Sequence, residues 1–291
     1  MKDEIADSYR EAGKIAAKIL AFGSEVVKVG ARYLDVVEEV EGRVIAEDAG
    51  LAFPLNISLN EDAAHDTASP GDDRIFFQGD LVKLDLGVHL EGYIADTAIT
   101  IDLGSHESLV KASREALASA IALVRPGVTI GELGSAVQYE IESLGYRPIV
   151  NLTGHGLERY TVHMPPNVPN IGIPGGAQLV EDMVFAIEPF ASTGTGHVSE
   201  KRRIEIYSQV SMRPVRLASA RRIIDTISDR HGMPFARRWL GKERLDIALS
   251  NLYRNGVLHA YPVLADIQGS FVSQHEHTLI VTADGCIVTT A

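Results

Sequence analysis

Two stretches of the sequence repeat the same order of segments, and this repetition limits the fold more than any other feature. Each stretch has two helix-like segments, followed by strand-like segments that carry a proline, an asparagine and a later histidine. Pro54 and Pro148 lie 94 residues apart, and Asp80 and Asp182 lie 102 residues apart. We interpret the repetition as an internal duplication of a helix-helix-strand-strand unit. Chance similarity between two α/β stretches is the alternative. The predicted class is α/β (α+β) with a pseudo-two-fold duplication.

Apolar residues recur at helical spacing in both stretches, which predicts a pair of amphipathic helices in each. The break between the two helices falls near Gly30 in the first stretch and near Gly127 in the second. Thr129 and Glu132 have the spacing of a capping box, so the second helix of the second pair is expected to begin there.

The region 197–272 interrupts the repeated pattern. Within it, 217–232 and 244–256 have the pattern of helices that end at a glycine. We therefore predict that 197–272 is a helical insertion subdomain. The catalytic domain would then comprise 1–196 together with 273–291.

Charge is distributed unevenly along the chain. The net charge of −12 argues against nucleic-acid binding over the whole surface. Residues 201–256, however, hold 13 of the 27 Lys+Arg and only 5 of the 39 Asp+Glu. The favoured interpretation is that these arginines pair with the acidic main domain and dock the insertion, because basic runs usually pair locally. The alternative is that pairs such as Arg221-Arg222 and Arg237-Arg238 bind RNA phosphate on the ribosome.

Nothing in the sequence predicts a membrane or secreted protein. No apolar run approaches the roughly 18 residues that a span needs, and the amphipathic N-terminus lacks the apolar core of a signal peptide. Cys286 is the single cysteine and cannot form an internal disulfide. We expect a soluble, cytoplasmic monomer.

Two aspartates lie almost symmetrically about a predicted turn at residues 90–92. Asp85 and Asp96 both sit in segments of strand composition, so a hairpin would bring their carboxylates opposite one another. Two facing anions inside a sheet repel unless a cation lies between them. A divalent metal would resolve the conflict, whereas two carboxylates that point into water are the alternative.

Three further polar residues stand beside apolar strand segments. His155 lies between glycines, Glu188 ends an apolar run, and Glu276 begins one. Each of them alone could be a structural polar group, but a buried carboxylate without a partner is costly. Together with the two aspartates they form an oxygen-rich set with one imidazole. Such a set needs about two divalent cations and suits Mn, Fe(II), Co or Zn.

The segments that carry these residues resemble the pita-bread metallopeptidases, and most closely the type II methionine aminopeptidases. The similarity runs in order along nearly the whole chain, and the 88 residues between Glu188 and Glu276 leave room for the helical insert of type II enzymes. The N-terminus without a polybasic extension is similar to the archaeal form. The matching segments are FPLNISLNEDAAH, KLDLGVHLEGYIADTA, NLTGHGLERYTVH, FAIEPFA and SQHEHTLIV.

The resemblance implies a pita-bread fold and removal of the initiator methionine from nascent proteins whose second residue is small. It also implies a dinuclear metal centre with a metal-bridging water. Asp96 and Glu276 would bridge the metals, Asp85 would bind one of them, and His155 and Glu188 the other. Glu188 would also handle the proton of the water.

Two histidines that are not ligands, His65 and His163, match residues that contact the substrate backbone and stabilise the tetrahedral oxyanion. Four further residues match the family's methionine pocket, with ordinary core packing as the alternative. His275 departs from the pattern, because an aromatic residue is expected before Glu276. It is either a spare polar group beside the metal or a substitute ring. The four pocket residues are Phe53, Val162, Phe190 and Tyr261.

Two other functions compete with the aminopeptidase. Non-catalytic RNA-binding paralogues share the fold but are expected to have lost metal ligands, and all five are present here. Prolidases and aminopeptidase P usually carry a separate N-terminal domain, for which this sequence has no counterpart. Peptide cleavage would distinguish all three.

Overall fold

The computed structural model describes residues 1–240 and 245–291, so Arg244, the predicted start of the last helix of the insertion, lies outside the described residues. Six helices and two short 3-10 turns are present in these ranges. They are α1 (Asp3–Val26), α2 (Tyr33–Ala46), α3 (Glu107–Leu123), α4 (Ile130–Ser143), α5 (Ala218–Ile227), η1 (Ser228–Arg230), η2 (Arg237–Trp239) and α6 (Leu245–Arg254).

The strands within the described ranges form four sheets. The first contains β1 (Gly50–Leu51), β2 (Asn56–Leu59), β4 (Leu81–Leu90) and β5 (Tyr93–Asp102). The second contains β6 (Arg147–Pro148), β10 (Phe190–Ser192) and β14 (Val272–Gln274). The third contains β3 (Asp62–Ala64), β11 (Ser199–Gln209), β12 (Phe235–Ala236) and β13 (Leu258–Ala265). The fourth contains β7 (Thr153–Glu158), β8 (Thr161–Pro169), β9 (Val184–Ile187), β15 (His277–Val281) and β16 (Cys286–Val288).

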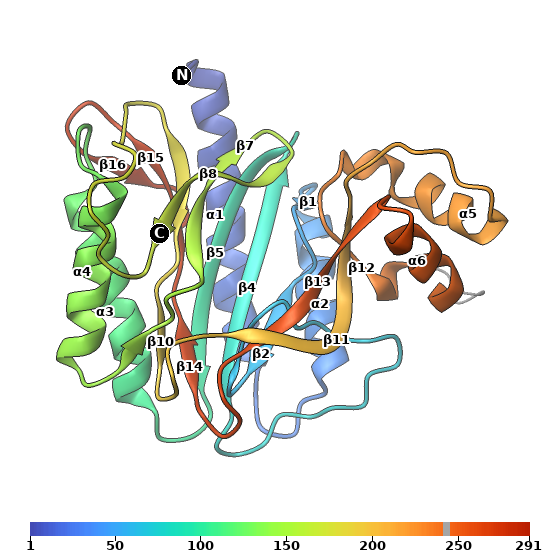
Figure 1. Cartoon of the computed structure of the whole chain (residues 1–291), viewed down its shortest axis with the longest axis horizontal. Coiled ribbons are helices and arrows are strands. Elements are labelled where there is room, and N and C mark those ends of the chain that lie inside the picture. Colours follow the sequence, from blue (N-terminus) through green and yellow to red (C-terminus); the bar gives the residue numbers. More distant parts are fainter. Residues whose placement is uncertain (241–244) are drawn as a thin grey trace.

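Each predicted helix pair packs on its own group of strands. The helices α1 and α2 bury their apolar faces against β4 and its neighbours in one core, and α3 and α4 do so against β9, β15 and β8 in a second core. Figure 1 shows the two pairs at separate places, with α3 and α4 at the left, α1 behind β4 and β5, and α2 to the right of β4. The pseudo-two-fold α/β architecture predicted from the repetition is confirmed.

The helix that begins after Thr129 has the predicted capping box. The Thr129 side chain accepts a hydrogen bond from the Glu132 amide, and the Glu132 carboxylate accepts one from the Thr129 amide at 2.8 Å. These bonds satisfy two donors that the first turn of a helix leaves unpaired, a contribution of about 1 kcal/mol. The sequence spacing was therefore enough to place this end of α4.

The β4–β5 hairpin turns at Glu91 and Gly92, as predicted, and both residues have positive φ angles, of 50° and 92°. Its register corrects one expectation, that the two aspartates face each other directly. Gly87 pairs with Asp96, and Asp85 pairs with Ala98. The two-residue turn fixes this register. It makes the aspartates diagonal neighbours on the same face, which still leaves their side chains within reach of one another.

The region between β10 and β14 contains both predicted helices, α5 and α6, and they share a small core with β12 and the first residue of β13. The chain reaches them through β11 and leaves through β13. These two strands pair with each other, and β13 pairs with β3 of the first half. The helices are therefore tied to the main fold by a continuous sheet. The predicted subdomain limits of 197 and 272 stay a prediction.

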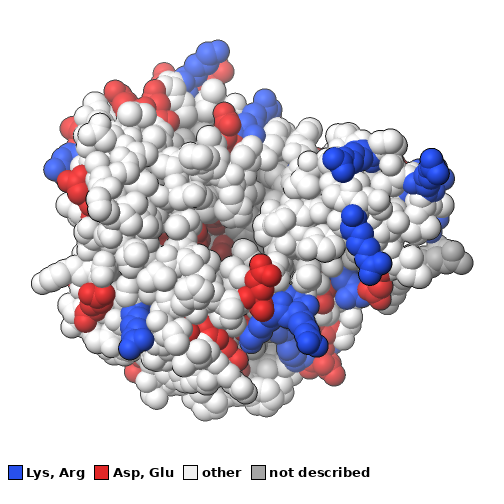
Figure 2. Space-filling model, in the orientation of Figure 1, with Lys and Arg blue, Asp and Glu red and all other residues white. Residues whose placement is uncertain are grey.

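Several arginines of the basic segment bind the rest of the chain. Arg230 donates to the carbonyls of Leu51 and Ala52, and Arg238 makes a buried ion pair with Glu41. Arg237 pairs with Asp246 at 2.5 Å within the segment itself. Figure 2 shows basic side chains over the part of the molecule where α5 and α6 lie in Figure 1. The contacts of Arg230 and Arg238 fit the docking interpretation.

Among the described helices, none combines the length and the apolar composition that crossing a bilayer would require.

Candidate metal centre and substrate cavity

All five residues predicted to hold metal line one cavity of about 220 Å³. They reach it from different elements of the two halves. Asp85 is on β4, Asp96 on β5 and His155 on β7, whereas Glu188 and Glu276 lie at the ends of β9 and β15. Figure 2 shows acidic side-chain atoms inside the hollow near the centre of the molecular surface in this view. The structure therefore brings together residues that are up to 191 positions apart in the sequence.

The two halves meet where β5 passes the segment that begins β15. Ala98 and Glu276 form a backbone bridge, and the Thr97 hydroxyl donates to the Glu276 carbonyl at 2.9 Å. The Thr278 hydroxyl accepts from the Asp96 amide and donates to the Asp96 carbonyl, both at 2.8 Å. These bonds fix the backbone of the two predicted bridging ligands relative to each other.

The imidazole of His155 faces the carboxylates with one particular nitrogen. Its Nε2 lies 3.6 Å from Asp96 Oδ2 and 3.8 Å from Glu188 Oε1. Its Nδ1 lies 3.4 Å from the Gly156 carbonyl, and a carbonyl can only accept, so Nδ1 carries the proton. That tautomer leaves the Nε2 lone pair directed at the carboxylates, as a metal ligand requires. Potential ligand atoms of Asp96, His155 and Glu276 all lie within 4.8 Å of one another.

Four carboxylates in this enclosed space resist ionisation. Burial raises the pKa of Asp85 to about 7, and burial followed by repulsion from neighbouring carboxylates raises the pKa of Asp96 and Glu276 well above the ordinary value. Burial raises the pKa of Glu188 well above its ordinary value too. Among the residues that the structure describes, one oxygen of each of Asp85, Asp96 and Glu276 has no hydrogen-bond partner. Unpaired buried oxygens are costly in a metal-free protein and are the atoms that a divalent cation would neutralise. The donor set therefore fits a metal centre.

These raised pKa values predict how metal-free protein responds to pH. Because the unfolded chain ionises Asp85 near pH 4 and the folded metal-free chain only near pH 7, stability is lost as the pH rises through that window. Bound metal favours the ionised form and removes the loss. We expect the difference in Tm between metal-loaded and chelator-treated protein to widen by roughly 5 °C or more between pH 5 and pH 7.5. Calorimetry in matched buffers measures it, and a constant difference would contradict this account of the site.

The two predicted non-ligand histidines also line the cavity. His65 Nδ1 lies 3.3 Å from the Pro262 carbonyl, which makes Nδ1 the protonated nitrogen and leaves Nε2 as an acceptor. The ring of His163 lies 4.4 Å from the ring of His155. Burial lowers the pKa of both His65 and His163 to about 4, so both are neutral at pH 7.

Three of the four predicted pocket residues, Phe53, Phe190 and Tyr261, line the cavity. The fourth, Val162, is buried in a core cluster with Leu157 and is not among the lining residues. It precedes His163 on β8, and neighbouring residues on a strand point to opposite faces.

Sequence reasoning missed several residues of the site. Gln274 donates to Asp85 and to Glu276, each at 3.4 Å, and thereby connects two predicted ligands. It lies two positions before Glu276, on the same face of the chain, so the strand period could have found it. The other missed residues line the cavity wall, and they are Asn56, Ala64, Asn151, Leu152, Thr153, Ile206 and Pro234.

The unexpected His275 does not contact the candidate metal ligands. Its Nδ1 lies 2.8 Å from the Ser113 hydroxyl on α3. Because it neighbours Glu276 in extended chain, its ring points away from the cavity side. Of the two interpretations offered for it, the spare polar group beside the metal is therefore wrong.

The sequence matches the metallopeptidase family M24 over residues 7–283. It is 49% identical to a methionine aminopeptidase of Archaeoglobus fulgidus over 291 residues, covering 100% of both chains. In structure it is similar to a methionine aminopeptidase of Thermotoga maritima (TM-score 0.75, 24% identity, 100% of this chain and 98% of that one). It is also similar to a thermophilic Arx1 (TM-score 0.88, 18% identity, 99% and 91%). At these identities the two structural similarities concern the fold alone.

The chain belongs to metallopeptidase family M24 and has its pita-bread fold. Within that family it is a metallo-aminopeptidase, a hydrolase that removes residues from the N-terminus of peptides.

Proposed function

We propose that this aminopeptidase removes the initiator methionine from nascent proteins whose second residue is small, and that it works with two divalent ions. The observation that supports this most is the meeting of five potential metal ligands, two neutral histidines and an aromatic wall in one cavity. The 49% identity to an archaeal methionine aminopeptidase over the full chain supports the same substrate.

The metal would be held by the five residues whose donors converge, with Asp96 and Glu276 as the proposed bridging pair. Two such ions would supply Lewis-acid activation of the attacking water and of the scissile carbonyl. Glu188 lines the same cavity, and one of its carboxylate oxygens would accept the proton of the attacking water and pass it to the leaving amine.

The two histidines would act on the substrate backbone. Neutral His65, with its proton on Nδ1, offers the Nε2 lone pair to a backbone N–H of the peptide. Neutral His163 would donate a hydrogen bond to the oxygen that becomes negative when the carbonyl is attacked, and this contact strengthens in the transition state.

The cavity wall predicts the specificity of cleavage. Phe53, Phe190 and Tyr261 enclose space beside the candidate ligands, and an unbranched, polarisable methionine side chain fills aromatic-lined space well. We expect Met-Ala and Met-Gly peptides to be cleaved, and Met-Lys, Leu-Ala and Ala-Pro to be poor substrates by at least about tenfold. Chromatography of the released amino acid measures each rate. Faster cleavage of Ala-Pro than of Met-Ala would contradict the proposed specificity and indicate an enzyme of the prolidase type.

Ribosome binding by the insertion stays a proposal. Arg237 and Arg238 make ion pairs within the chain, so the phosphate contacts would fall to exposed residues such as Arg202, Arg213 and Arg221.

A further inference from the structure

The backbone of His65 adopts a conformation that this residue holds only under constraint. Its φ of 66° lies in the left-handed region, which is unfavourable for a residue with a side chain. Such a conformation persists when surrounding contacts fix it. The placement of the imidazole therefore depends on what holds the chain on either side of His65.

The two sides of His65 are held in different ways. Before it, β3 pairs with β13, where Ala64 faces Leu264. After it, Asp66 has a side chain that is 1% exposed and accepts three hydrogen bonds. The donors are Arg74 Nη1 at 2.7 Å, Arg203 Nε at 2.8 Å and the Tyr33 hydroxyl at 3.1 Å.

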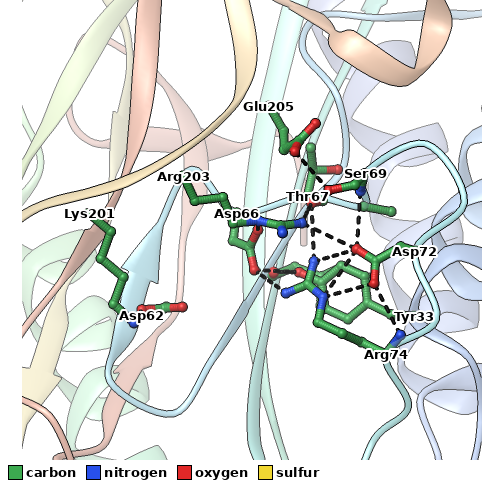
Figure 3. Close-up of polar contacts among 12 residues, drawn as sticks. Tyr33, Asp62, Asp66, Thr67, Ser69, Asp72, Arg74, Lys201, Arg203 and Glu205 are labelled. Atoms are coloured by element: carbon green, nitrogen blue, oxygen red, sulfur yellow. Dashed lines mark hydrogen bonds and ion pairs between the residues drawn. The ribbon is translucent and has the colours of Figure 1, made fainter. Parts of the chain in front are cut away.

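Arg203 is the one of these donors that lies on β11, the strand whose Ile206 lines the substrate cavity. It lies on β11, in the stretch between Glu200 and Ile204 where the pairing with β13 shifts register. Such irregularities redirect side chains. Figure 3 shows Arg203 reaching from its strand to Asp66, close to Arg74. It also donates to the Thr67 carbonyl at 3.0 Å.

The partner strand of β11 carries the acceptor for the imidazole. Pro262 and Tyr261 belong to β13, and Tyr261 packs edge-on against His65 with ring centroids 5.4 Å apart. Arg203 thus ties the segment after His65 to the same pair of strands that provides the hydrogen bond and the ring contact.

Loss of Arg203 would remove the bond between β11 and Asp66, but the segment after His65 would keep its other contacts. Asp66 would keep Arg74 and Tyr33 as donors, and Arg74 is itself held by Asp72 through Nε at 3.0 Å and Nη2 at 2.7 Å. Removing Arg203 therefore leaves no buried carboxylate without a partner, the condition that makes a broken ion pair severely destabilising.

We propose that Arg203 is a positioning residue for this reaction: through Asp66 it holds the His65 imidazole against the Pro262 carbonyl, with its other nitrogen toward the substrate. The proposal rests on the proposed contact between His65 and the peptide backbone.

The variants are Arg203→Gln, Arg203→Lys and, as a matched control, Lys201→Gln. Lys201 is a cation on the same strand that forms ion pairs with Glu61 and Asp62 instead of Asp66. Arg203→Gln should lower kcat on Met-Ala peptides about tenfold to a hundredfold, because a small misplacement of a catalytic contact costs that much. Arg203→Lys should recover part of the loss. Lys201→Gln should stay within about twofold of the parent, because it leaves the bonds from Arg74 and Arg203 to Asp66 in place. Metal content should not change in any of them.

A double-mutant cycle with His65→Ala separates positioning from general destabilisation. If Arg203 acts through His65, Arg203→Gln should cause little further loss of kcat in the His65→Ala protein. The same fold-loss in both backgrounds would overturn the proposal, as would parental activity of Arg203→Gln. Parental activity of His65→Ala would instead refute the substrate contact proposed for His65, and the positioning role with it.

Nitrogen-15 spectra of the imidazoles in zinc-loaded protein observe the positioning directly. The His65 signals, assigned by their absence in His65→Ala, should show one Nδ1–H tautomer in the parent and in Lys201→Gln. In Arg203→Gln and Arg203→Lys this tautomer should be averaged with the other, more strongly in Gln. An unchanged His65 tautomer in Arg203→Gln would overturn the proposal.

Discussion

Glu276→Gln should abolish peptide cleavage, by at least about a thousandfold, and lower the metal content of the purified protein. Glu276 is 1% exposed and one of its carboxylate oxygens has no partner within the described protein. The amide that replaces it carries no negative charge, so it is a poor bridge between two cations. The three carboxylates that remain still repel one another, and the site has one charge fewer with which to hold the metal. Elemental analysis and a cleavage assay on the same sample measure both effects.

The control for this change is Glu142→Gln, which neutralises an exposed carboxylate on α4 that takes no part in the cavity. It should keep the parental metal content and rate. Full metal occupancy with normal turnover in Glu276→Gln would show that the proposed bridging role is wrong.

His163→Ala should lower kcat by roughly two to three powers of ten, the usual loss for one donor to a developing oxyanion. Metal content should stay normal, because His155, not His163, directs a ring nitrogen at the carboxylates. KM should change much less than kcat, since the contact strengthens only as the carbonyl is attacked. Steady-state kinetics with elemental analysis measures the separation.

His197→Ala serves as the comparison, because His197 is exposed and does not line the cavity. It should behave as the parent protein does. A metal ion lost from His163→Ala would mean that the two imidazoles have exchanged roles in our assignment.

Much of this site could be predicted from residues whose chemistry conflicts with their surroundings. Carboxylates at the ends or in the middle of apolar strands, such as Asp96 and Glu276, are costly there without a cation, and the sequence shows the conflict directly. The helix start at Thr129 was likewise visible, because a capping box is a local pattern.

What the sequence left open depends on register and on long-range contacts. The diagonal offset of Asp85 and Asp96 follows from the pairing across a two-residue turn, and a one-residue change in that turn would alter it. The role of Arg203 depends on an irregular strand meeting a loop that is 137 residues away in the sequence. The basic count of the insertion could not show which arginines bind inward.

The proposed two-metal centre is tested most directly by anomalous diffraction from crystals of metal-loaded protein. We predict two peaks about 3.5–4 Å apart, as in other two-metal hydrolases. They should be enclosed by the five residues Asp85, Asp96, His155, Glu188 and Glu276. Peaks elsewhere, or a cavity without a metal peak in crystals whose dissolved protein cleaves Met-Ala peptides, would contradict it.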